Sequence, residues 1–176
     1  EAFKMIDDKN VRLVLFGSMG DKNVEKLIGT DSRINYIGWL NREETLAILK
    51  YADIGIWNTQ HTTLLEDCIA VGLPLILRYY GSTCHLIEGN GVFLYNGSVR
   101  EIYEKIKLVI DNKELLDKFK NNAILIRDIL SYDNIALESI QYRQTLDPKD
   151  LHKKFMAKKY SDIDYKFFRR IDRTLV

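Results

Sequence analysis

The 176-residue sequence lacks several features that mark particular classes of protein. No apolar run approaches the roughly 18 to 20 residues that a membrane span needs. The opening EAFKMIDDKN has no cationic flank followed by an apolar core, as a secretion signal would. The only two cysteines, Cys68 and Cys84, have neither zinc-site spacing nor a small disulfide-rich scaffold around them. These absences predict a cytoplasmic protein with reduced thiols, and we expect Cys68 in the core of a helix.

Common nucleotide-binding and hydrolase motifs are also absent. The sequence contains no Gly-x-Gly-x-x-Gly, no P-loop and no Gly-x-Ser-x-Gly, which argues against dehydrogenases, nucleotidases and hydrolases built on those loops. His61 and His85 stand apart from acidic residues and thiols at metal-ligand spacing. The sequence therefore predicts neither a metal site nor a bound cofactor.

Charge is distributed unevenly along the chain. Residues 147–176 carry nine Lys or Arg against five Asp or Glu, whereas residues 1–146 carry 17 against 20. The slightly acidic body argues against a nucleic-acid groove, which needs clustered cations to neutralise phosphates. Two interpretations of the basic tail stay open. It contacts anionic lipid, which would make the protein membrane-associated, or it is a solvated helix that packs on protein.

Short apolar runs alternate with helical patterns over most of the chain. Several runs are apolar almost throughout, which is typical of strands buried on both faces of a parallel sheet. The alternation predicts an α/β fold: a doubly wound, Rossmann-like parallel sheet with helices on both faces, and ligands at the carboxyl ends of its strands. The expected strands are 11–16, 33–38, 53–57, 74–78 and 92–95, and the expected helices are 1–8, 22–28, 43–52, one starting near 64, 84–87 and 98–110.

From Lys113 the pattern becomes purely helical. Two further helices end near Gln144, before Asp147-Pro148 interrupts the pattern. We therefore expect a Rossmann-like domain over residues 1–130, followed by a helical, basic extension over residues 131–176.

The stretch 57–77, WNTQHTTLLEDCIAVGLPLIL, joins one expected strand to the next through a polar loop and a short helix. Unpaired backbone N–H groups at the helix start, on Thr62, Thr63 and Leu64, can bind a diphosphate without a charged side chain. Glu66 has two interpretations that local sequence weighs evenly. It closes a capping box with Thr63, or it holds the two hydroxyls of a ribose.

Two other strand ends carry candidate ligand contacts. Gly17 ends the first expected strand and would let a ligand approach closely, although turn geometry alone also explains a glycine there. Trp39 and Leu40 follow the second strand, and Asn41 after them is an expected helix cap. Trp39 can stack on a nucleobase or seal the core, and the general behaviour of tryptophan favours the core.

Four segments, LVLFG, RINYIGWLNREETLAILKYADIGIW, TTLLEDCIAVGLPLIL and GVFLYNGSVREIYEKIKLVIDNKELLDKF, occur in this order. Together they resemble the C-terminal, nucleotide-sugar-binding domain of group 1 (family 4) GT-B glycosyltransferases. The resemblance covers roughly residues 1–130. Its most specific part is LLEDCIAVGLPLI, which is similar to the second half of the family's E-x7-E signature.

The resemblance implies donor contacts residue by residue. Glu66, as the second glutamate of the signature, would bind the donor ribose, and the backbone of residues 62–64 would meet the diphosphate. Trp39 and Leu40 would contact the base. The first glutamate would fall eight positions before Glu66, where this sequence has Asn58, so contacts to the transferred sugar depart from the family pattern. No catalytic residue follows from the resemblance.

Members of the family usually begin this domain with a V-G-R-L type of strand followed by a lysine, whose cations face the leaving diphosphate. This sequence begins after that point, and no Lys or Arg lies in the loop from Asn58 to Thr63. The resemblance therefore implies a fragment that lacks its first strand and an N-terminal acceptor-binding domain. We expect such a fragment to be inactive alone.

These expectations give one leading function and two alternatives. The parent protein would be a hexosyltransferase-like glycosyltransferase. It would move a sugar from a UDP- or GDP-sugar to a glycan, lipid-linked or other acceptor, with retention and without a metal. One alternative is a nucleotide-sugar 2-epimerase of the same GT-B architecture. The other is a non-catalytic module that binds a nucleotide-sugar or a protein partner.

Overall fold

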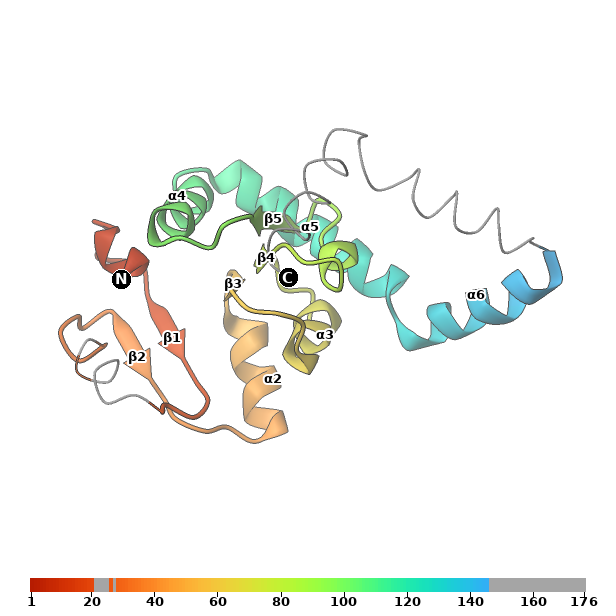
Figure 1. The fold of residues 1–176 in the computed structure, drawn as a ribbon, viewed down its shortest axis with the longest axis horizontal. Helices are drawn as coiled ribbons and strands as arrows, with labels where there is room; N and C mark the ends of the chain where they lie inside the picture. The colour runs from red at the N-terminus through yellow and green to blue at the C-terminus, as the bar shows by residue number, and fades with distance from the viewer. Residues whose placement is uncertain (21–25, 27, 146–176) are drawn as a thin grey trace, which may run out of the picture. The chain divides into compact units, whose positions relative to one another are not determined.

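A computed structural model describes residues 1–20, 26 and 28–145 (Figure 1). Most of the helix predicted over 22–28 lies outside these residues, and so does the basic tail with its predicted lipid contact. The chain divides into two compact units, Glu1–Ser131 and Tyr132–Val176. In the second unit the described residues form one helix, α6 (Tyr132–Thr145). Among the described residues, no helix is both long and apolar enough to cross a membrane.

The first unit has the predicted α/β architecture, with five parallel strands and helices on both of their faces. Both ends of each observed strand lie within two residues of the predicted ends. The helix predicted over residues 1–8 is instead a short 3₁₀ helix, η1. The strands are β1 (Leu13–Leu15), β2 (Ile34–Tyr36), β3 (Gly55–Trp57), β4 (Leu75–Arg78) and β5 (Gly91–Leu94). The helices are η1 (Ala2–Met5), α2 (Arg42–Tyr51), α3 (Thr63–Ala70), η2 (Cys84–Leu86), α4 (Val99–Ile110) and α5 (Lys113–Ile129).

The strands form two sheets rather than the single sheet that the sequence predicted. β1 pairs with β2, and β3, β4 and β5 form a second sheet in that order. The register places Leu13 opposite Ile34 in the first sheet and Trp57 opposite Leu77 in the second. Within the described residues, no strand pairing joins β1 to β3.

Two apolar clusters cover β4 from opposite faces, because successive side chains of a strand point to opposite sides. Leu75 and Leu77 pack with Leu65 and Cys68 of α3, whereas Ile76 packs with residues of η1, α4 and α5. Cys68 is fully buried in α3, as predicted. Burial raises the pKa of its thiol to about 12, which makes Cys68 a poor nucleophile near neutral pH.

Local capping fixes the helix starts and the loops before them. Asn41 caps α2 and forms a capping box with Glu44, so the predicted cap is confirmed. Ser98 caps α4 by accepting the N–H of Glu101 at 3.2 Å. The Glu101 carboxylate in turn accepts the N–H groups of residues 95–97 at 2.6 to 2.9 Å. These bonds hold the loop that follows β5 in one conformation.

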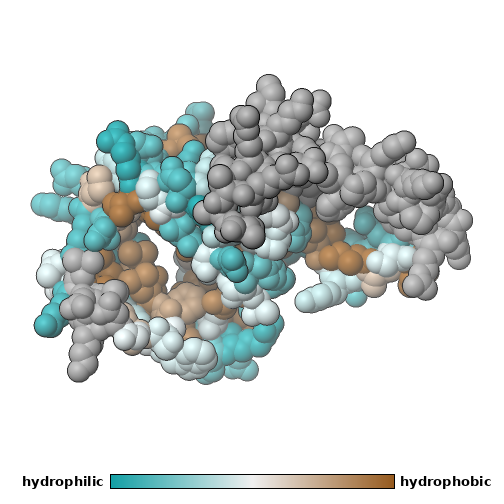
Figure 2. Space-filling model, viewed as in Figure 1, coloured by the Kyte–Doolittle hydropathy of each residue, from teal (hydrophilic) through white to brown (hydrophobic). Residues whose placement is uncertain are grey.

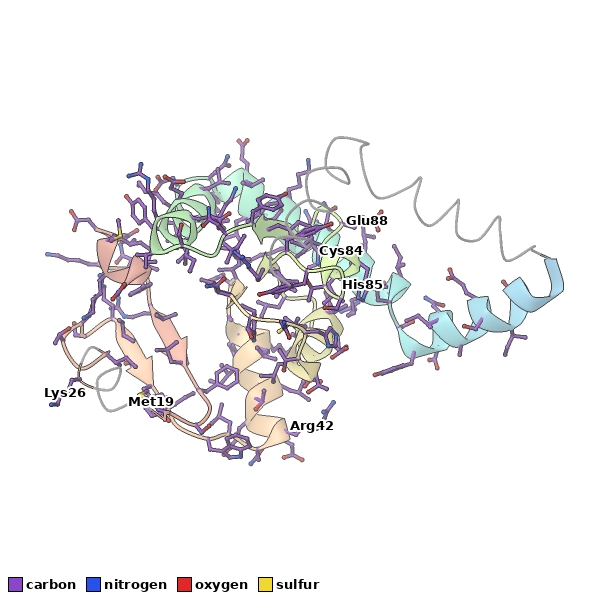
Figure 3. All side chains as sticks on the ribbon, viewed as in Figure 1. Met19, Lys26, Arg42, Cys84, His85 and Glu88 are labelled. Carbon is purple, nitrogen blue, oxygen red and sulfur yellow. The ribbon has the colours of Figure 1, made fainter. Side chains whose placement is uncertain are left out.

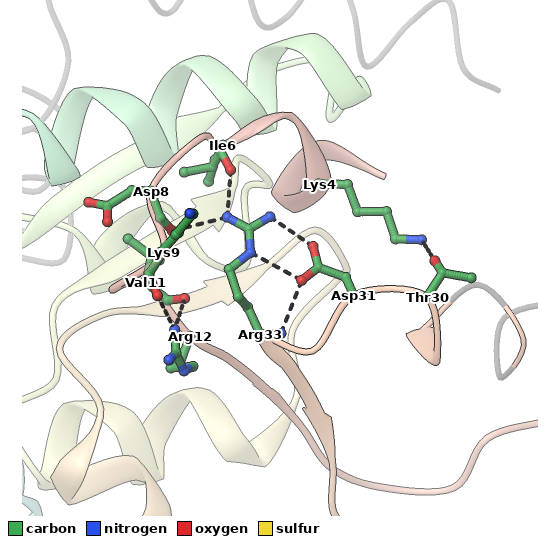
Figure 4. A network of polar contacts seen from close by, with 9 residues as sticks. All are labelled: Lys4, Ile6, Asp8, Lys9, Val11, Arg12, Thr30, Asp31 and Arg33. Carbon is green, nitrogen blue, oxygen red and sulfur yellow. Dashed lines mark hydrogen bonds and ion pairs between the residues drawn. The ribbon is translucent and has the colours of Figure 1, made fainter.

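Arg33 links β2 to the segment that precedes β1 (Figure 4). Its guanidinium donates to the carbonyls of Ile6 and Asp8 at 2.5 and 3.0 Å, and to both carboxylate oxygens of Asp31 at 3.1 and 2.8 Å. It also lies 5.0 Å from the centroid of the Phe3 ring. Hydrogen bonds from the side chain and backbone of Arg33 lower the pKa of Asp31 to about 2.

We expect Asp31→Asn to remove part of the acid sensitivity of the fold. Because the pKa of Asp31 is lower in the folded state, its carboxylate stabilises the fold above about pH 4. This contribution is lost as the pH falls towards about 2. The Tm difference between wild type and Asp31→Asn should therefore shrink from neutral pH to about pH 2, as followed by circular dichroism.

Asp117→Asn is the matched control for this experiment. Asp117 lies on the exposed face of α5, and no ion pair of the described residues involves it. A Tm difference for Asp31→Asn that stays constant between neutral pH and about pH 2 would contradict the prediction.

Candidate functional site

Most predicted site residues follow the carboxyl ends of strands, and they form two groups. Gly17, Trp39 and Leu40 follow the strands of the two-stranded sheet, whereas Asn58 and the start of α3 follow β3. The residues just before Gly17 and Asn58 are Phe16 and Trp57, and both pack against the same core cluster. The ends of β1 and β3 therefore border one common region of the first unit.

The helix α3 begins one residue earlier than the capping-box interpretation requires. Thr62 is the N-cap, and its hydroxyl accepts the N–H of Leu64 at 3.5 Å. Thr63 is the first helical residue, so Glu66 occupies the fourth helical position, one beyond the place of a capping-box carboxylate. The capping interpretation of Thr63 and Glu66 is therefore wrong.

Glu66 pairs with His61 instead of capping the helix. His61 Nε2 lies 2.8 Å from Glu66 Oε1. The side chain of Glu66 is 44% exposed, and within the described part of the chain its Oε2 has no partner. Glu66 thus presents one oxygen that is available as a hydrogen-bond acceptor.

The first turn of α3 also presents backbone donors. Among the described residues, the N–H of Thr63 has no partner, and the N–H of Leu64 makes only the long bond to Thr62. Such donors at the positive end of a helix attract anions. One helical turn therefore offers donors for an anion and, at Glu66, an acceptor for hydroxyl groups.

Asn58 has a role in the fold. Its Nδ2 donates to the carbonyl of Gly97 at 3.0 Å and so ties the loop after β3 to the loop after β5. A Cβ on Gly97 would lie 2.1 Å from Asn58 Oδ1, and Gly97 has a φ of +63°. Only glycine fits this position.

Arg78 is a further candidate site residue, which the sequence did not single out. It ends β4, and its Nη1 would lie 2.8 Å from a Cβ on Gly97, beside Asn58. This nitrogen is buried and has no hydrogen-bond partner among the described residues. Its guanidinium lies 5.9 Å from the ring centroid of Tyr80. A signal was present in the sequence, because Arg78 is the one charged residue closing the apolar run LPLILR.

The loops after β1 and β2 hold each other in place. Gly17 has a φ of +109°, which favours glycine. Its N–H donates to the carbonyl of Gly38 at 2.8 Å, and its carbonyl accepts a hydrogen bond from the Tyr36 hydroxyl at 2.7 Å. Trp39 is 79% exposed, so the expectation of a core position is wrong. Leu40 beside it is half-buried. An exposed indole at a strand end is available for stacking.

Cys84, His85 and Glu88 gather around η2, after β4 (Figure 3). The described residues nevertheless contain no group of three or more His, Cys, Asp or Glu side chains that could hold a metal ion. The site as described therefore consists of backbone donors, Glu66, Arg78 and the exposed Trp39.

Comparison with known proteins gives one family match. Residues 1–125 match the family model described as glycosyl transferases group 1. Among curated proteins there is no match.

Several solved structures share the fold. One is HepE from Anabaena in complex with UDP, with a TM-score of 0.64 and 18% identity over 81% of this chain and 42% of that one. HepE in complex with UDP-glucose has a TM-score of 0.60 and 18% identity, over 72% of this chain and 38% of that one. Sucrose-phosphate synthase from Thermosynechococcus elongatus has a TM-score of 0.64 and 18% identity, over 81% and 40%. The chain thus spans about two fifths of the length of these proteins.

Proposed function

The chain belongs to the group 1 glycosyl transferases, and from this membership we propose that it is the donor-binding, C-terminal part of a family 4 enzyme. The enzyme transfers a sugar from a nucleotide-sugar to an acceptor. The proposal rests mainly on the first turn of α3. Among the described residues, the N–H of Thr63 is unpaired there, the N–H of Leu64 makes only a long bond, and the nearby Glu66 carboxylate has one unpaired oxygen. The UDP and UDP-glucose complexes of HepE support a uridine nucleotide as the donor.

Each part of the donor has a proposed partner. The N–H groups of Thr63 and Leu64 bind the diphosphate at the positive helix end, where no charged side chain is required. Glu66 accepts hydrogen bonds from the ribose hydroxyls through the oxygen that His61 leaves unpaired. Trp39 stacks on the base, and Leu40 lines the same contact.

Arg78 supplies the positive charge that the loop from Asn58 to Thr63 lacks. Its buried Nη1 needs an acceptor, and a diphosphate oxygen is an acceptor of the right charge. Negative charge accumulates on the leaving nucleoside diphosphate during sugar transfer. A guanidinium and a helix N-terminus that are fixed in advance stabilise this charge.

We also propose that the transfer needs no metal, because Arg78 and the helix end meet the diphosphate charge, and that it proceeds with retention, as the proposed family 4 membership implies. We expect the 176-residue chain to bind the donor without transferring the sugar alone, since it spans about two fifths of the matched structures. NMR of the products of a longer protein tests the anomeric configuration. The same spectra would reveal epimerised donor if the enzyme were a 2-epimerase.

We expect the chain to bind UDP-glucose, and Glu66→Gln to weaken this binding about tenfold. The substitution keeps the shape of the side chain but replaces one acceptor oxygen by a donor, which costs about 1.5 kcal/mol at a charged hydrogen bond. Saturation-transfer NMR and calorimetry with UDP-glucose and GDP-mannose measure the effect.

Glu43→Gln is the matched control, because the substitution makes the same change of charge at an exposed residue in the first turn of α2. Its binding should equal that of the wild type. No saturation transfer to either nucleotide-sugar would contradict the donor-binding function. Equal binding by wild type and Glu66→Gln would remove Glu66 from the site.

A further inference from the structure

One carboxylate holds the whole loop between β5 and α4. The two side-chain oxygens of Glu101 accept the three consecutive N–H groups of residues 95–97, at 2.6, 2.9 and 2.7 Å. A side chain that bonds to three successive backbone groups fixes the path of the backbone between them, and hydrogen bonds to a carboxylate are among the strong ones. The loop after β5 therefore keeps one conformation as long as the Glu101 carboxylate stays in place.

Helix capping alone does not explain this arrangement. Ser98 already caps α4, and Glu101 occupies the third helical position, where a capping-box glutamate would accept the N–H of the cap residue. The Ser98 N–H donates instead to Asn96 Oδ1 at 2.8 Å, and the Glu101 carboxylate reaches past the cap to the loop. Other charged side chains at the start of α4 face solvent. Arg100 and Glu104 are 85% and 54% exposed, and Figure 2 shows hydrophilic atoms at the surface around α4.

The loop that Glu101 holds packs on two polar side chains of the candidate site. The carbonyl of Gly97 accepts a hydrogen bond from Asn58 Nδ2 at 3.0 Å. A Cβ on Gly97 would lie 2.1 Å from Asn58 Oδ1 and 2.8 Å from Arg78 Nη1. Both distances are shorter than van der Waals contact, so the glycine backbone lies directly against the amide and the guanidinium. Gly97 thus connects the Glu101 carboxylate with the residues at the ends of β3 and β4.

The position of the Arg78 guanidinium depends on this packing. The backbone of Arg78 is fixed by the ladder between β4 and β5 and by the Thr83 hydroxyl, which donates to its carbonyl at 2.9 Å. At the tip of the side chain, Nη1 is buried and has no hydrogen-bond partner among the described residues. A long side chain whose tip makes no hydrogen bond there takes the rotamer that its neighbours leave open. One of these neighbours is Gly97, whose place is set by Glu101.

We propose that Glu101 is a positioning residue of the donor site. It keeps the loop of residues 95–97 against Arg78, so that the buried Nη1 is in place for a diphosphate oxygen before the nucleotide binds. A guanidinium that is ordered in advance binds an anion more tightly, because ordering of the side chain no longer opposes binding. The inference rests on the proposed contact between Arg78 and the diphosphate. Glu101 itself does not touch the donor.

Glu101→Gln should weaken UDP binding about tenfold, the effect of losing one preordered side chain, and leave uridine binding unchanged. The amide keeps the size of the side chain, but it has one acceptor oxygen and turns N–H donors towards the loop, so it cannot accept all three N–H groups. Calorimetric titrations with UDP and uridine measure the difference. Glu104→Gln is the matched control, because it makes the same change of charge at an exposed residue of α4. It should bind both ligands as the wild type does.

A double-mutant cycle with Arg78→Met separates positioning from a general effect on the fold. If Glu101 acts through Arg78, Glu101→Gln should change UDP affinity about tenfold in the wild type and less than about twofold in the Arg78→Met variant. Ser98→Ala is the structural control, because it removes the cap of α4 and leaves the Glu101 carboxylate in place. It should lower the Tm without a selective loss of UDP binding.

NMR without a ligand distinguishes a failure of this inference from a failure of the proposed function. The guanidinium Nε–H signal of Arg78, assigned by its absence in Arg78→Met, should shift in Glu101→Gln and stay in place in Ser98→Ala and Glu104→Gln. An unshifted signal in Glu101→Gln would overturn the inference. Unchanged or tighter UDP binding, equal weakening of UDP and uridine, or an equal loss in both backgrounds of the cycle would also overturn it.

Absence of UDP binding by the wild type would instead overturn the proposed function. A shifted Arg78 signal in Glu101→Gln would then still assign Glu101 to the placement of the guanidinium.

Discussion

Gly91→Ala is expected to destabilise the first unit by about 3 kcal/mol or more. A Cβ on Gly91 would lie 1.9 Å from the carbonyl oxygen of Leu75 and 2.8 Å from its carbonyl carbon. Both are backbone atoms of β4, so no rotation of a side chain relieves the clash. The pairing of Leu75 with Gly91 in the ladder between β4 and β5 has to separate instead. Because β4 lies at the centre of the three-stranded sheet, the whole core is disturbed.

Alanine substitutions at two other glycines provide a comparison for the loss of stability. Gly81→Ala is the matched control, since no atom lies within 4 Å of its Cβ position, and its stability should stay within about 0.5 kcal/mol of the wild type. Gly55→Ala should fall between the two. Its Cβ would lie 2.2 Å from the ring of Trp57, and the far end of a side chain can move.

Urea unfolding followed by circular dichroism measures the three variants. A Gly91→Ala variant that is insoluble while Gly81→Ala folds agrees with the prediction. Equal midpoints for Gly91→Ala and Gly81→Ala would contradict the close approach of β5 to the β4 backbone at Leu75.

The elements of the fold could be predicted because their signals are local. The helix starts at Asn41 and Ser98 depend on side chains that bond to backbone groups three residues away. The strands follow from short apolar runs such as LPLIL, which indicate burial on both faces. The absence of a pairing between β1 and β3 among the described residues could not be predicted in this way. An apolar run predicts a strand, but the identity of the neighbouring strand depends on residues distant in the sequence.

The geometry of the candidate site was predicted less completely for a related reason. Thr62 and Thr63 are equally good caps, so the sequence did not decide which one begins α3, and that choice decides whether Glu66 caps the helix or faces a ligand. Arg78 and Asn58 are 20 positions apart. The register that pairs Trp57 with Leu77 brings the next residues of both strands together. Strand register depends on the whole core. A search for cations within one loop therefore could not find Arg78 on the neighbouring strand.

Arg78→Met is expected to weaken UDP binding about 50-fold with little change in stability. A hydrogen bond between a guanidinium and a diphosphate oxygen contributes about 1.5 to 3 kcal/mol, or about 10- to 150-fold in affinity. Stability changes little because Nη1 has no partner among the described residues, so the substitution removes an unpaired buried donor. Methionine retains much of the apolar stem of the arginine.

Titrations with uridine, UDP and UDP-glucose separate this role from that of Glu66. Arg78→Met should weaken the two ligands that carry phosphates and leave uridine unchanged. Glu66→Gln should weaken all three by the same factor, because each contains the ribose. Arg100→Met removes the same charge from an arginine whose side chain is 85% exposed on α4, and it should bind all three as the wild type does.

The opposite pattern would assign Arg78 to the fold. If Arg78→Met lowered the unfolding midpoint and weakened uridine as much as UDP, the guanidinium would be holding the loops after β3 and β5 around Gly97. Unchanged UDP binding would exclude it from the diphosphate site. Arg78 is a diphosphate contact only if Arg78→Met weakens the binding of UDP and UDP-glucose and leaves the binding of uridine unchanged. The charge that the loop from Asn58 to Thr63 lacks would then come from the neighbouring strand.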